Sequence, residues 1–347
     1  MTTEDNRRER SRVSLVATLL NEYGSLPQWL RGLRNQTRLP DECIIVDGGS
    51  TDGTLELLQA ADLPFPTTIL VRPGVNISAG RNAAIRKASG DIIAVTDAGT
   101  EARPDWLARL VEPLESCPAV DIAAGFFEAE AGTFWEQTLV ATTLPDAAEV
   151  DPDRFLPSSR SVAFRRAWIE YGFGYPEWLD YCEDVVLDLQ LRRAGARQVF
   201  VPEARVRFAP RRGPVAFSRQ YFRYARGDGK AGLFARRHAI RYVTYSGLLA
   251  VLARRRPHEI AVAGVLGAIY ITPNVRRYRR WNGAASPGIG CWLGVVGMIG
   301  FQRLIGDVAK MIGYPVGLVW RARRDRSLKL WKTTWVNRLD SGDLPRF

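Results

Sequence analysis

Short apolar runs separated by turn residues dominate the first 115 residues of the chain. The run 43–46 (Cys-Ile-Ile-Val) is rich in β-branched residues and ends at Asp47, where glycines and small polar residues begin. A run of this length bounded by turn residues is typical of a buried parallel strand. Runs of the same character predict strands at 13–20, 67–71 and 91–96.

Segments of helical character alternate with these strands. They cover residues 26–33, 55–61, 78–88 and 104–114, and Ser78 is a candidate N-cap for the third of them. Strand–helix alternation with short connections predicts an α/β fold, with a mostly parallel sheet flanked by helices.

Two of the predicted strands end in a carboxylate that is followed by small residues, at Asp47 and at Asp97. Ligands of open α/β sheets bind just beyond the carboxyl ends of the strands. The pair is therefore a candidate ligand site at one edge of the sheet. The alternative is that each aspartate caps the following helix or turn, a common role for this residue.

A third acidic cluster lies in 174–195, where a helix is expected from Cys182 up to Gly195. Glu183 and Asp184 fall in its first turn. Negative charge there stabilises the helix dipole, which would be a purely structural role. The functional alternative is a carboxylate that acts as a general base.

The charge is divided unevenly along the 347 residues, whose net charge is +11. Residues 1–200 carry a net charge of −10 and residues 201–347 one of +21. The basic half could contact anionic lipid or phosphate-bearing substrates. The four cysteines match no metal-ligand spacing, and Cys43 is expected as a buried free thiol, which suggests a reducing compartment. The charged N-terminus does not resemble a signal peptide, so export is not expected.

The basic half begins with 211–237, where Arg219, Arg223 and Arg226 share one helical face. We expect Gly227–Lys230 to form a flexible loop after it. Apolar stretches follow, and 306–324 is expected as an amphipathic interfacial helix. The stretch at 260–273 is too short to span a bilayer, whereas the stretch at 287–305 approaches that length. Arginine groups (254–256, 276–280, 321–326) and tryptophans (281, 292, 320, 331, 335) flank the apolar stretches 242–253, 260–273 and 287–305.

We expect this half to associate with an anionic membrane surface, with one or two true spans possible. The alternative is an ordinary buried helical domain. Interleaved arginines and aromatics also suit nucleic acid, but the acidic front half and the lack of a nucleic-acid-binding motif argue against it.

These motifs resemble the inverting glycosyltransferases of family 2, which have the GT-A fold, over roughly residues 12–212. VSLVATLLNE is similar to the family's opening strand, and IIVDGGSTDGT to its nucleotide-binding strand end. GRNAAIRKASGDIIAVTDAGT resembles the segment leading to the Asp-x-Asp metal motif. The segment 157–195 matches the acceptor side, ending in the Glu-Asp of the catalytic base.

The resemblance implies roles for individual residues. Thr18, Glu22 and Asp47 would hold the base and ribose of a nucleotide-sugar, and Arg81 would lie near its phosphates. Asp97 would face the ribose and a divalent metal. Asp184 would deprotonate the acceptor hydroxyl with support from Glu183, and the acceptor would invert the anomeric carbon. The segment 211–237, which contains Arg223 and Arg226, resembles the family's Gln-x-x-Arg-type motif, which packs over the donor diphosphate.

Two positions depart from the family pattern. The usual second Asp of the first motif is Gly48, and the second Asp of the metal motif is Gly99. Mg²⁺ and Mn²⁺ prefer oxygen ligands, and glycine has no side chain to offer. Asp97 and the phosphates could suffice, another residue such as Glu101 could supply a ligand, or metal dependence could be weak.

We therefore predict a GT-A catalytic domain at 1–212 and a basic helical region at 213–347. The protein would be a glycosyltransferase on the cytoplasmic face of the cell membrane. It would transfer a sugar from a nucleotide-diphosphate sugar to a glycan or lipid-linked acceptor, and nucleic acid is not an expected partner. The alternative is a non-catalytic GT-A scaffold in a glycan-assembly complex, motivated by Gly99.

Other classes fit the sequence less well. A Rossmann dehydrogenase is disfavoured because no G-x-G-x-x-G follows a strand. A nucleotidyltransferase would need a glycine-rich loop after the first strand. A histidine-based site is not expected, since His238 and His258 both lie in the basic half.

Overall fold

The computed structural model describes the backbone of residues 10–282 and 289–340 and the side chains of 10–282 and 290–324. Within these ranges the chain forms two compact units. The first contains residues up to Glu128 together with Val150–Ala209, and the second contains Ala129–Glu149 and Pro210–Asn337. Ala129–Glu149, which the sequence assigned to the catalytic domain, therefore groups with the second unit.

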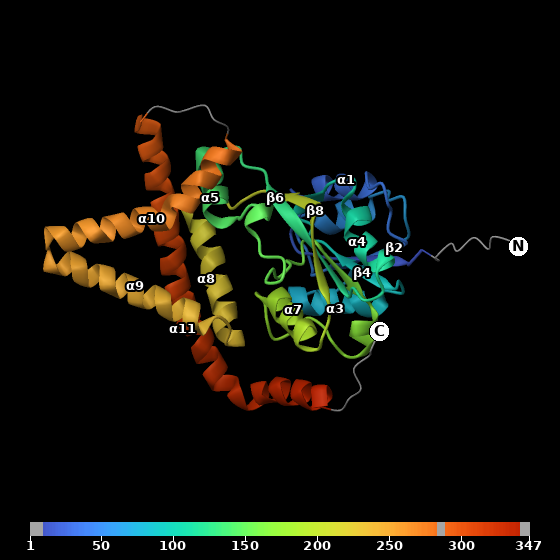
Figure 1. Ribbon diagram of the computed structural model, residues 1–347. Coiled ribbons are helices and arrows are strands. Elements are labelled where there is room, and N and C mark those ends of the chain that lie inside the picture. The colour runs from blue at the N-terminus through green and yellow to red at the C-terminus, as the bar shows by residue number, and fades with distance from the viewer. Residues whose placement is uncertain (1–9, 283–288, 341–347) are drawn as a thin grey trace, which may run out of the picture. The chain divides into compact units, whose positions relative to one another are not determined.

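The first unit is built on a mixed sheet (Figure 1). Among the described residues its strands are β1 (Val13–Leu19), β2 (Glu42–Asp47), β3 (Thr67–Val71), β4 (Ile92–Val95), β5 (Thr100–Ala102), β6 (Ile122–Ala129), β7 (Val162–Arg165) and β8 (Gln198–Phe208). Their order across the sheet is β3-β2-β1-β4-β7-β6-β8-β5. β1 pairs in parallel with β2 and β4, and β2 with β3. β7 is antiparallel to β4 and β6, and β5 to β8.

The four strands predicted from apolar runs are the four parallel ones. β1, β2 and β4 could be predicted because they are buried and therefore apolar over nearly their whole length. β3 is partly exposed and was predicted from its β-branched residues. The antiparallel half has weaker patterns. β5 is only three residues long, and β8 mixes buried with half-exposed and exposed positions.

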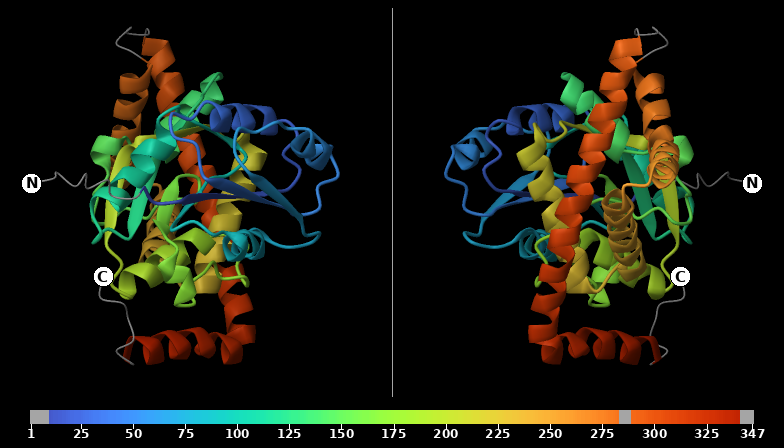
Figure 2. Two further views of the ribbon diagram at one scale, coloured as in Figure 1. Left: turned by 90° about the vertical axis from the view of Figure 1, so that its right-hand side faces the viewer. Right: turned by 90° about the vertical axis from the view of Figure 1, so that its left-hand side faces the viewer.

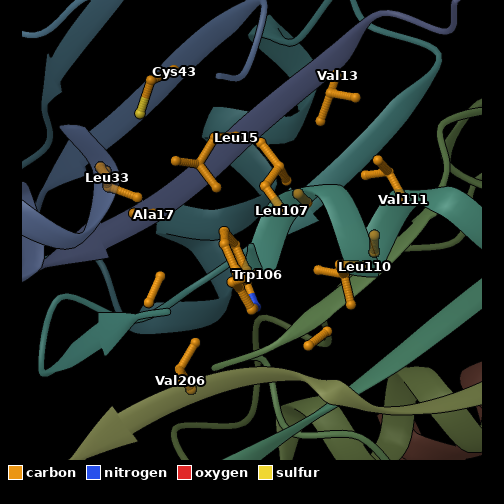
Figure 3. Packing of buried hydrophobic residues seen from close by; sticks show 14 of the residues in the cluster. Val13, Leu15, Ala17, Leu33, Cys43, Trp106, Leu107, Leu110, Val111 and Val206 are labelled. Atoms are coloured by element: carbon orange, nitrogen blue, oxygen red, sulfur yellow. The ribbon is translucent and has the colours of Figure 1, made fainter. Parts of the chain in front are cut away.

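The core of this unit lies between the sheet and helices that include α1 (Leu26–Arg34) and α4 (Trp106–Ser116). Figure 3 shows Trp106 of α4 among Leu15 and Ala17 of β1 and Val206 of β8. The Trp106 indole donates to Ser161 Oγ at 2.8 Å, so its buried N–H is satisfied. Cys43 lies in the same core as a free thiol, as predicted, and burial raises its pKa.

The other predicted helices of the first unit lie close to their expected positions, as α1 (Leu26–Arg34), α2 (Thr54–Gln59), α3 (Ile77–Lys87) and α7 (Glu183–Arg193). The short helix α6 (Ala167–Glu170) was not predicted. The predicted N-cap of α3 was wrong. Asn76 takes this position, and its side chain accepts from Ala79 N at 2.9 Å. Ser78 instead donates from its hydroxyl to the Leu179 carbonyl.

The second unit is helical. It contains α5 (Phe134–Thr143), a 3₁₀ turn at Ala147–Glu149, α8 (Pro214–Ala231), α9 (Ala235–Arg254), α10 (Pro257–Trp281) and α11 (Ile289–Asp340). α9 and α10 form an antiparallel hairpin that turns at Arg255 (Figure 1).

The predicted flexible loop at Gly227–Lys230 was wrong, because these residues continue α8. Its glycines serve close packing against α11. A Cβ on Gly229 would lie 2.3 Å from the Tyr314 carbonyl oxygen, and one on Gly317 would lie 2.2 Å from the Arg226 carbonyl oxygen. Figure 2 shows α11 running alongside α8. The glycines therefore let the two helix backbones approach closely.

α11 joins the apolar stretch near 287–305 and the segment 306–324 into one helix, so the interfacial helix predicted at 306–324 is not separate. Gly290–Arg324 is long and apolar enough to cross a membrane, judged by length and composition. It also carries buried polar groups: Gln302 bonds to Thr138 of α5, and Asp307 pairs with Arg241 of α9. Residues 287 and 288 and the side chains of Arg326, Trp331 and Trp335 lie outside the described residues.

Candidate functional site

Three adjacent parallel strands bring the predicted ligand residues to one edge of the sheet. β1 lies between β2 and β4, with Leu19 opposite Asp47 and Val16 opposite Val95. Thr18 near the end of β1, Asp47 at the end of β2 and Asp97 just after β4 therefore share this edge. Asp47 and Asp97 lie on the same edge of the sheet, as predicted, with β1 between their strands.

Asp47 is fully buried, and only one of its two carboxylate oxygens has hydrogen-bond partners among the described residues. Its Oδ2 accepts from Gly49 N at 2.9 Å and Ser50 N at 3.0 Å. Gly49 has φ +93°, which allows the chain to turn back over the carboxylate. Among the described residues, Oδ1 of Asp47 and Oγ1 of Thr18 are buried without a hydrogen-bond partner. Buried polar atoms normally have partners, so these two are suited to a bound ligand.

The loop after β1 is fixed against the loop after β2. Asn21 has φ 56°, and its side chain accepts from Thr51 N at 2.9 Å. The Glu22 backbone N–H donates to Thr54 Oγ1 at 2.8 Å, and the Glu22 carboxylate accepts from Ser25 Oγ. The Glu22 side chain is half-buried, and its Oε2 lies 4.0 Å from the point where a Cβ on Gly99 would stand.

Arg81 joins the strand edge to the third acidic cluster. Its side chain is 2% exposed, and its two terminal nitrogens each donate at 2.7 Å, one to Asp97 Oδ1 and one to Glu183 Oε1. The guanidinium also lies over the Tyr175 ring, 5.1 Å from its centroid. α3 carries Arg81 to this place because the small Gly80 packs directly against Thr18, leaving no room for a Cβ.

Glu183 and Asp184 occupy the first turn of α7, as predicted. Cys182 before them has φ 65°, a left-handed conformation that is uncommon for a side chain of this kind. Burial raises the pKa of Asp184, and the positive charge of Arg81 partly offsets this; Asp97 and Arg160 also act on it. Burial and the Asp184 charge raise the pKa of Glu183. Asp184 therefore belongs electrostatically to the same cluster as Asp97 and Arg81.

Sequence reasoning missed the residues that hold the loop before α7. Asn82 of α3 accepts from Tyr175 N at 2.9 Å and donates to its carbonyl at 2.8 Å. Asn76 donates to the Glu177 carbonyl and Ser78 to that of Leu179. These residues are polar positions on a helix, about 100 residues from their partners, so no local pattern pointed to them.

Arg160 is a second residue that the sequence analysis missed. Its Nε lies 3.9 Å from Asp97 Oδ2, and its guanidinium lies over the Phe208 ring at 4.8 Å. Its side chain is about one quarter exposed, whereas that of Arg81 is buried. Arg160 is therefore the more accessible cation beside Asp97.

Arg223 and Arg226 lie on α8 in the second unit. Their predicted contact with a donor diphosphate stays a prediction.

Residues 14–171 match the model of the family described as "Glycosyl transferase family 2". Residues 14–171 therefore form a glycosyl transferase family 2 domain. The strand–helix order and the carboxylates at the strand ends agree with the GT-A fold of this family, which the sequence predicted.

Two curated relatives of this transferase illustrate the range of similarity. It is 26% identical over 329 residues to "Succinoglycan biosynthesis protein ExoA" of Rhizobium meliloti (strain 1021), covering 89% of this chain and 92% of the relative. It is 35% identical over 114 residues to "Undecaprenyl-phosphate 4-deoxy-4-formamido-L-arabinose transferase" of Pseudomonas fluorescens (strain Pf0-1). That match covers 30% of this chain and 32% of the relative.

Among solved structures, the transferase is similar to "Mannosyltransferase PcManGT from Pyrobaculum calidifontis in complex with GDP-Man and Mn2+". The sequence identity is 18%, the TM-score is 0.49, and the match covers 91% of this chain and 88% of that one.

A divalent cation is the expected cofactor of the family, and the donor set of this transferase fits it only in part. In the described ranges no three His, Cys, Asp or Glu side chains are grouped to hold a metal. Asp97 has one oxygen bound by Arg81, and Glu101 is held by Gln28 and Arg31. Glu22 is a second carboxylate that could accompany Asp97, since its Oε2 lies 4.0 Å from the Cβ position of Gly99. Two carboxylates fit a cation whose other ligands come from the donor diphosphate.

Proposed function

We propose that this family 2 glycosyltransferase transfers a sugar from its nucleotide-sugar donor to an acceptor hydroxyl with inversion, using Asp184 as general base. The observation that carries the proposal is the position of Arg81. One buried guanidinium binds Asp97, on the predicted donor side, and Glu183, the neighbour of Asp184. Donor and base residues from distant parts of the chain therefore form one cluster.

The donor nucleoside would bind at the ends of β1 and β2. Asp47 and Thr18 offer buried oxygens without partners, which suit ribose hydroxyls and the polar edge of a base. Asp97, at the end of β4, would face the ribose. Arg81 was expected near the phosphates, but both of its terminal nitrogens already bind carboxylates. Its role in this proposal is to position those carboxylates.

Asp184 would accept the proton of the acceptor hydroxyl as the oxygen attacks the anomeric carbon. The new glycosidic bond forms as the bond to the nucleoside diphosphate breaks, and the diphosphate leaves with the electron pair. A raised pKa suits this role, because a base works best when its pKa lies nearer the operating pH. A divalent cation held by Asp97 and the donor would neutralise charge on the leaving diphosphate.

The acceptor is proposed to be a lipid-linked or envelope glycan. Two observations support this: relatives act in succinoglycan biosynthesis or on undecaprenyl-phosphate by their names, and the second unit exposes large apolar side chains. On the α9–α10 hairpin these include Val243, Leu249, Val262, Val265, Leu266 and Ile269, each more than half exposed. The triple Arg254–Arg256 lies at the turn of this hairpin. This surface is suited to the cytoplasmic face of a membrane with anionic lipid.

The test of the base is Asp184→Asn. We expect transfer to fall roughly 100-fold or more, since general base catalysis contributes that much. Donor binding should be retained. Asp105→Asn is the matched control, because Asp105 is an exposed aspartate of the same unit that pairs with Arg109. Full transfer by a folded Asp184→Asn protein would exclude Asp184 as the general base. An unchanged phenotype of Asp184→Asn in cells, together with wild-type protein that transfers no sugar, would instead support the non-catalytic scaffold.

A further inference from the structure

The starting observation is the space at Gly99, where the family motif carries its second carboxylate. A Cβ added there would meet no atom closer than 4.0 Å, and the atom at that distance is Glu22 Oε2. A carboxylate oxygen of an aspartate lies about 2.4 Å from its own Cβ, by standard covalent geometry. The Glu22 carboxylate therefore stands close to the place that an aspartate at position 99 would fill.

The Glu22 carboxylate is held in this place by the fold. The backbone N–H of Glu22 donates to Thr54 Oγ1 at 2.8 Å, and Oε2 of its carboxylate accepts from Ser25 Oγ. The neighbouring Asn21 binds the loop after β2 through its side chain. These contacts fix the loop that follows β1, so Glu22 has a defined position beside the loop that follows β4.

The charge of the site favours a cation. Carboxylates along this edge and at the start of α7 are those of Glu22, Asp47, Asp97, Glu183 and Asp184, and the guanidiniums bound among them are Arg81 and Arg160. The donor diphosphate adds further negative charge. An anionic ligand placed among excess carboxylates needs a compensating cation, and oxygen ligands suit Mg²⁺ or Mn²⁺.

Glu101, the other candidate, is less suited. Its two oxygens accept from Gln28 Nε2 at 3.0 Å and Arg31 Nε at 3.1 Å. These contacts hold its pKa below the usual range against the opposing effect of burial. Glu101 would have to leave both partners to bind a metal.

We infer that Glu22 supplies the metal ligand that Gly99 lacks, and that Glu22 and Asp97 bind a divalent cation together with the donor diphosphate. This inference rests on the proposed function and gives Glu22 a role beyond the nucleoside contact expected from the family resemblance. The protein supplies only two carboxylates, so metal and nucleotide should bind cooperatively. Each should bind more weakly alone.

The experiment is calorimetry on the full chain in detergent, in which UDP, GDP and dTDP are titrated with Mn²⁺ or with EDTA. Mn²⁺ should tighten binding of the preferred nucleotide roughly tenfold or more, within the range of ordinary coupling energies. Glu22→Gln should remove most of this enhancement. Loss of the nucleoside contact would weaken binding equally with Mn²⁺ and with EDTA, so the ratio of the two affinities is the quantity that reports the metal ligand. Adding Gly99→Asp to Glu22→Gln should restore the enhancement, because the space at 99 accepts a side chain.

Glu101→Gln is the matched control and should keep the full Mn²⁺ effect. The inference is overturned if Glu22→Gln keeps the enhancement, if Glu101→Gln loses it, or if Mn²⁺ has no effect on a nucleotide that binds the wild-type protein. In all three cases nucleotide still binds, so the proposed transferase stands. Failure of every nucleotide to bind folded protein, with or without Mn²⁺, would overturn the proposed function as well.

Discussion

At the scale of residues, the feature that organises the site is a buried arginine between carboxylates. Arg81 is 2% exposed and binds Asp97 and Glu183 through separate nitrogens. A buried guanidinium needs such partners, because an unpaired charge in the interior is costly. The same contacts set the charge around Asp184, whose pKa burial raises and Arg81 lowers.

This arrangement predicts the pH dependence of transfer. The base must be ionised, so kcat/KM should fall as the pH drops through the raised pKa of Asp184. Arg81→Gln removes the charge that lowers this pKa and should move the acidic limb of the profile to higher pH. The measurement is kcat/KM against pH for the wild type, Arg81→Lys and Arg81→Gln.

Arg81→Lys is the control that retains the charge, and its acidic limb should stay close to that of the wild type. An unmoved limb in folded Arg81→Gln protein would contradict the electrostatic role of Arg81. A loss of rate without a shift of the limb would indicate a geometric role.

At the scale of elements, glycines decide how α8 and α11 pack. Gly229 of α8 and Gly313 and Gly317 of α11 each lie against backbone atoms of the other helix, at distances that no Cβ could keep. In an isolated helix glycines of this kind would be unfavourable, which is why Gly227 and Gly229 suggested a loop in the sequence. Here close approach of the two helices outweighs that cost.

We therefore expect Gly317→Ala to destabilise the second unit. Its Cβ would lie 2.2 Å from the Arg226 carbonyl oxygen, and overpacking of this kind costs about 1–3 kcal/mol or more. Gly247→Ala on α9 is the matched control, since no atom lies within 4 Å of its added Cβ. Alanine there should stabilise the helix by up to about 1 kcal/mol.

The measurement is thermal unfolding in detergent, followed by circular dichroism. An unchanged midpoint for Gly317→Ala would show that α8 and α11 do not pack as closely as described.

At the scale of the whole molecule, charge and exposed apolar side chains are divided unevenly between the two halves of the chain. The net charge is −10 over residues 1–200, which hold the proposed site, and +21 over the remainder, where apolar side chains are exposed. A basic, apolar surface is attracted to anionic lipid by both charge and burial.

This division predicts binding to vesicles. The protein should sediment with liposomes that contain anionic lipid, and less so at high salt because salt screens the charges. Replacing Leu249, Val262 and Leu266 by serine should weaken binding at least about tenfold, since burying one such side chain contributes about 1.5–3 kcal/mol.

The control for this experiment is Leu39→Ser with Val71→Ser, two exposed apolar residues of the first unit. Equal loss of binding in both variants would show that the α9–α10 hairpin is not the lipid-binding surface.

The sequence by itself determined the parallel half of the sheet and the residues at its edge. Buried strands are apolar over their whole length, and the turns after them carry Asp47 and Asp97, so both signals are local. The position of Asp184 in the first turn of α7 was likewise visible, because helix starts have their own pattern. Family motifs of this kind are contiguous, and the match at residues 14–171 covers the first three of them and the start of the fourth.

The tertiary structure alone decided which of these residues contact one another. Arg81 and Glu183 are about 100 residues apart, and only folding shows that they form an ion pair. Glu22 lies beside Gly99 because β1 and β4 are neighbours in the sheet, whereas the sequence directed attention to the nearer Glu101. The glycines of α8 predicted a loop, whereas they are helical because they pack against the backbone of α11. In each case the deciding energy belongs to a contact between distant segments, which no local pattern contains.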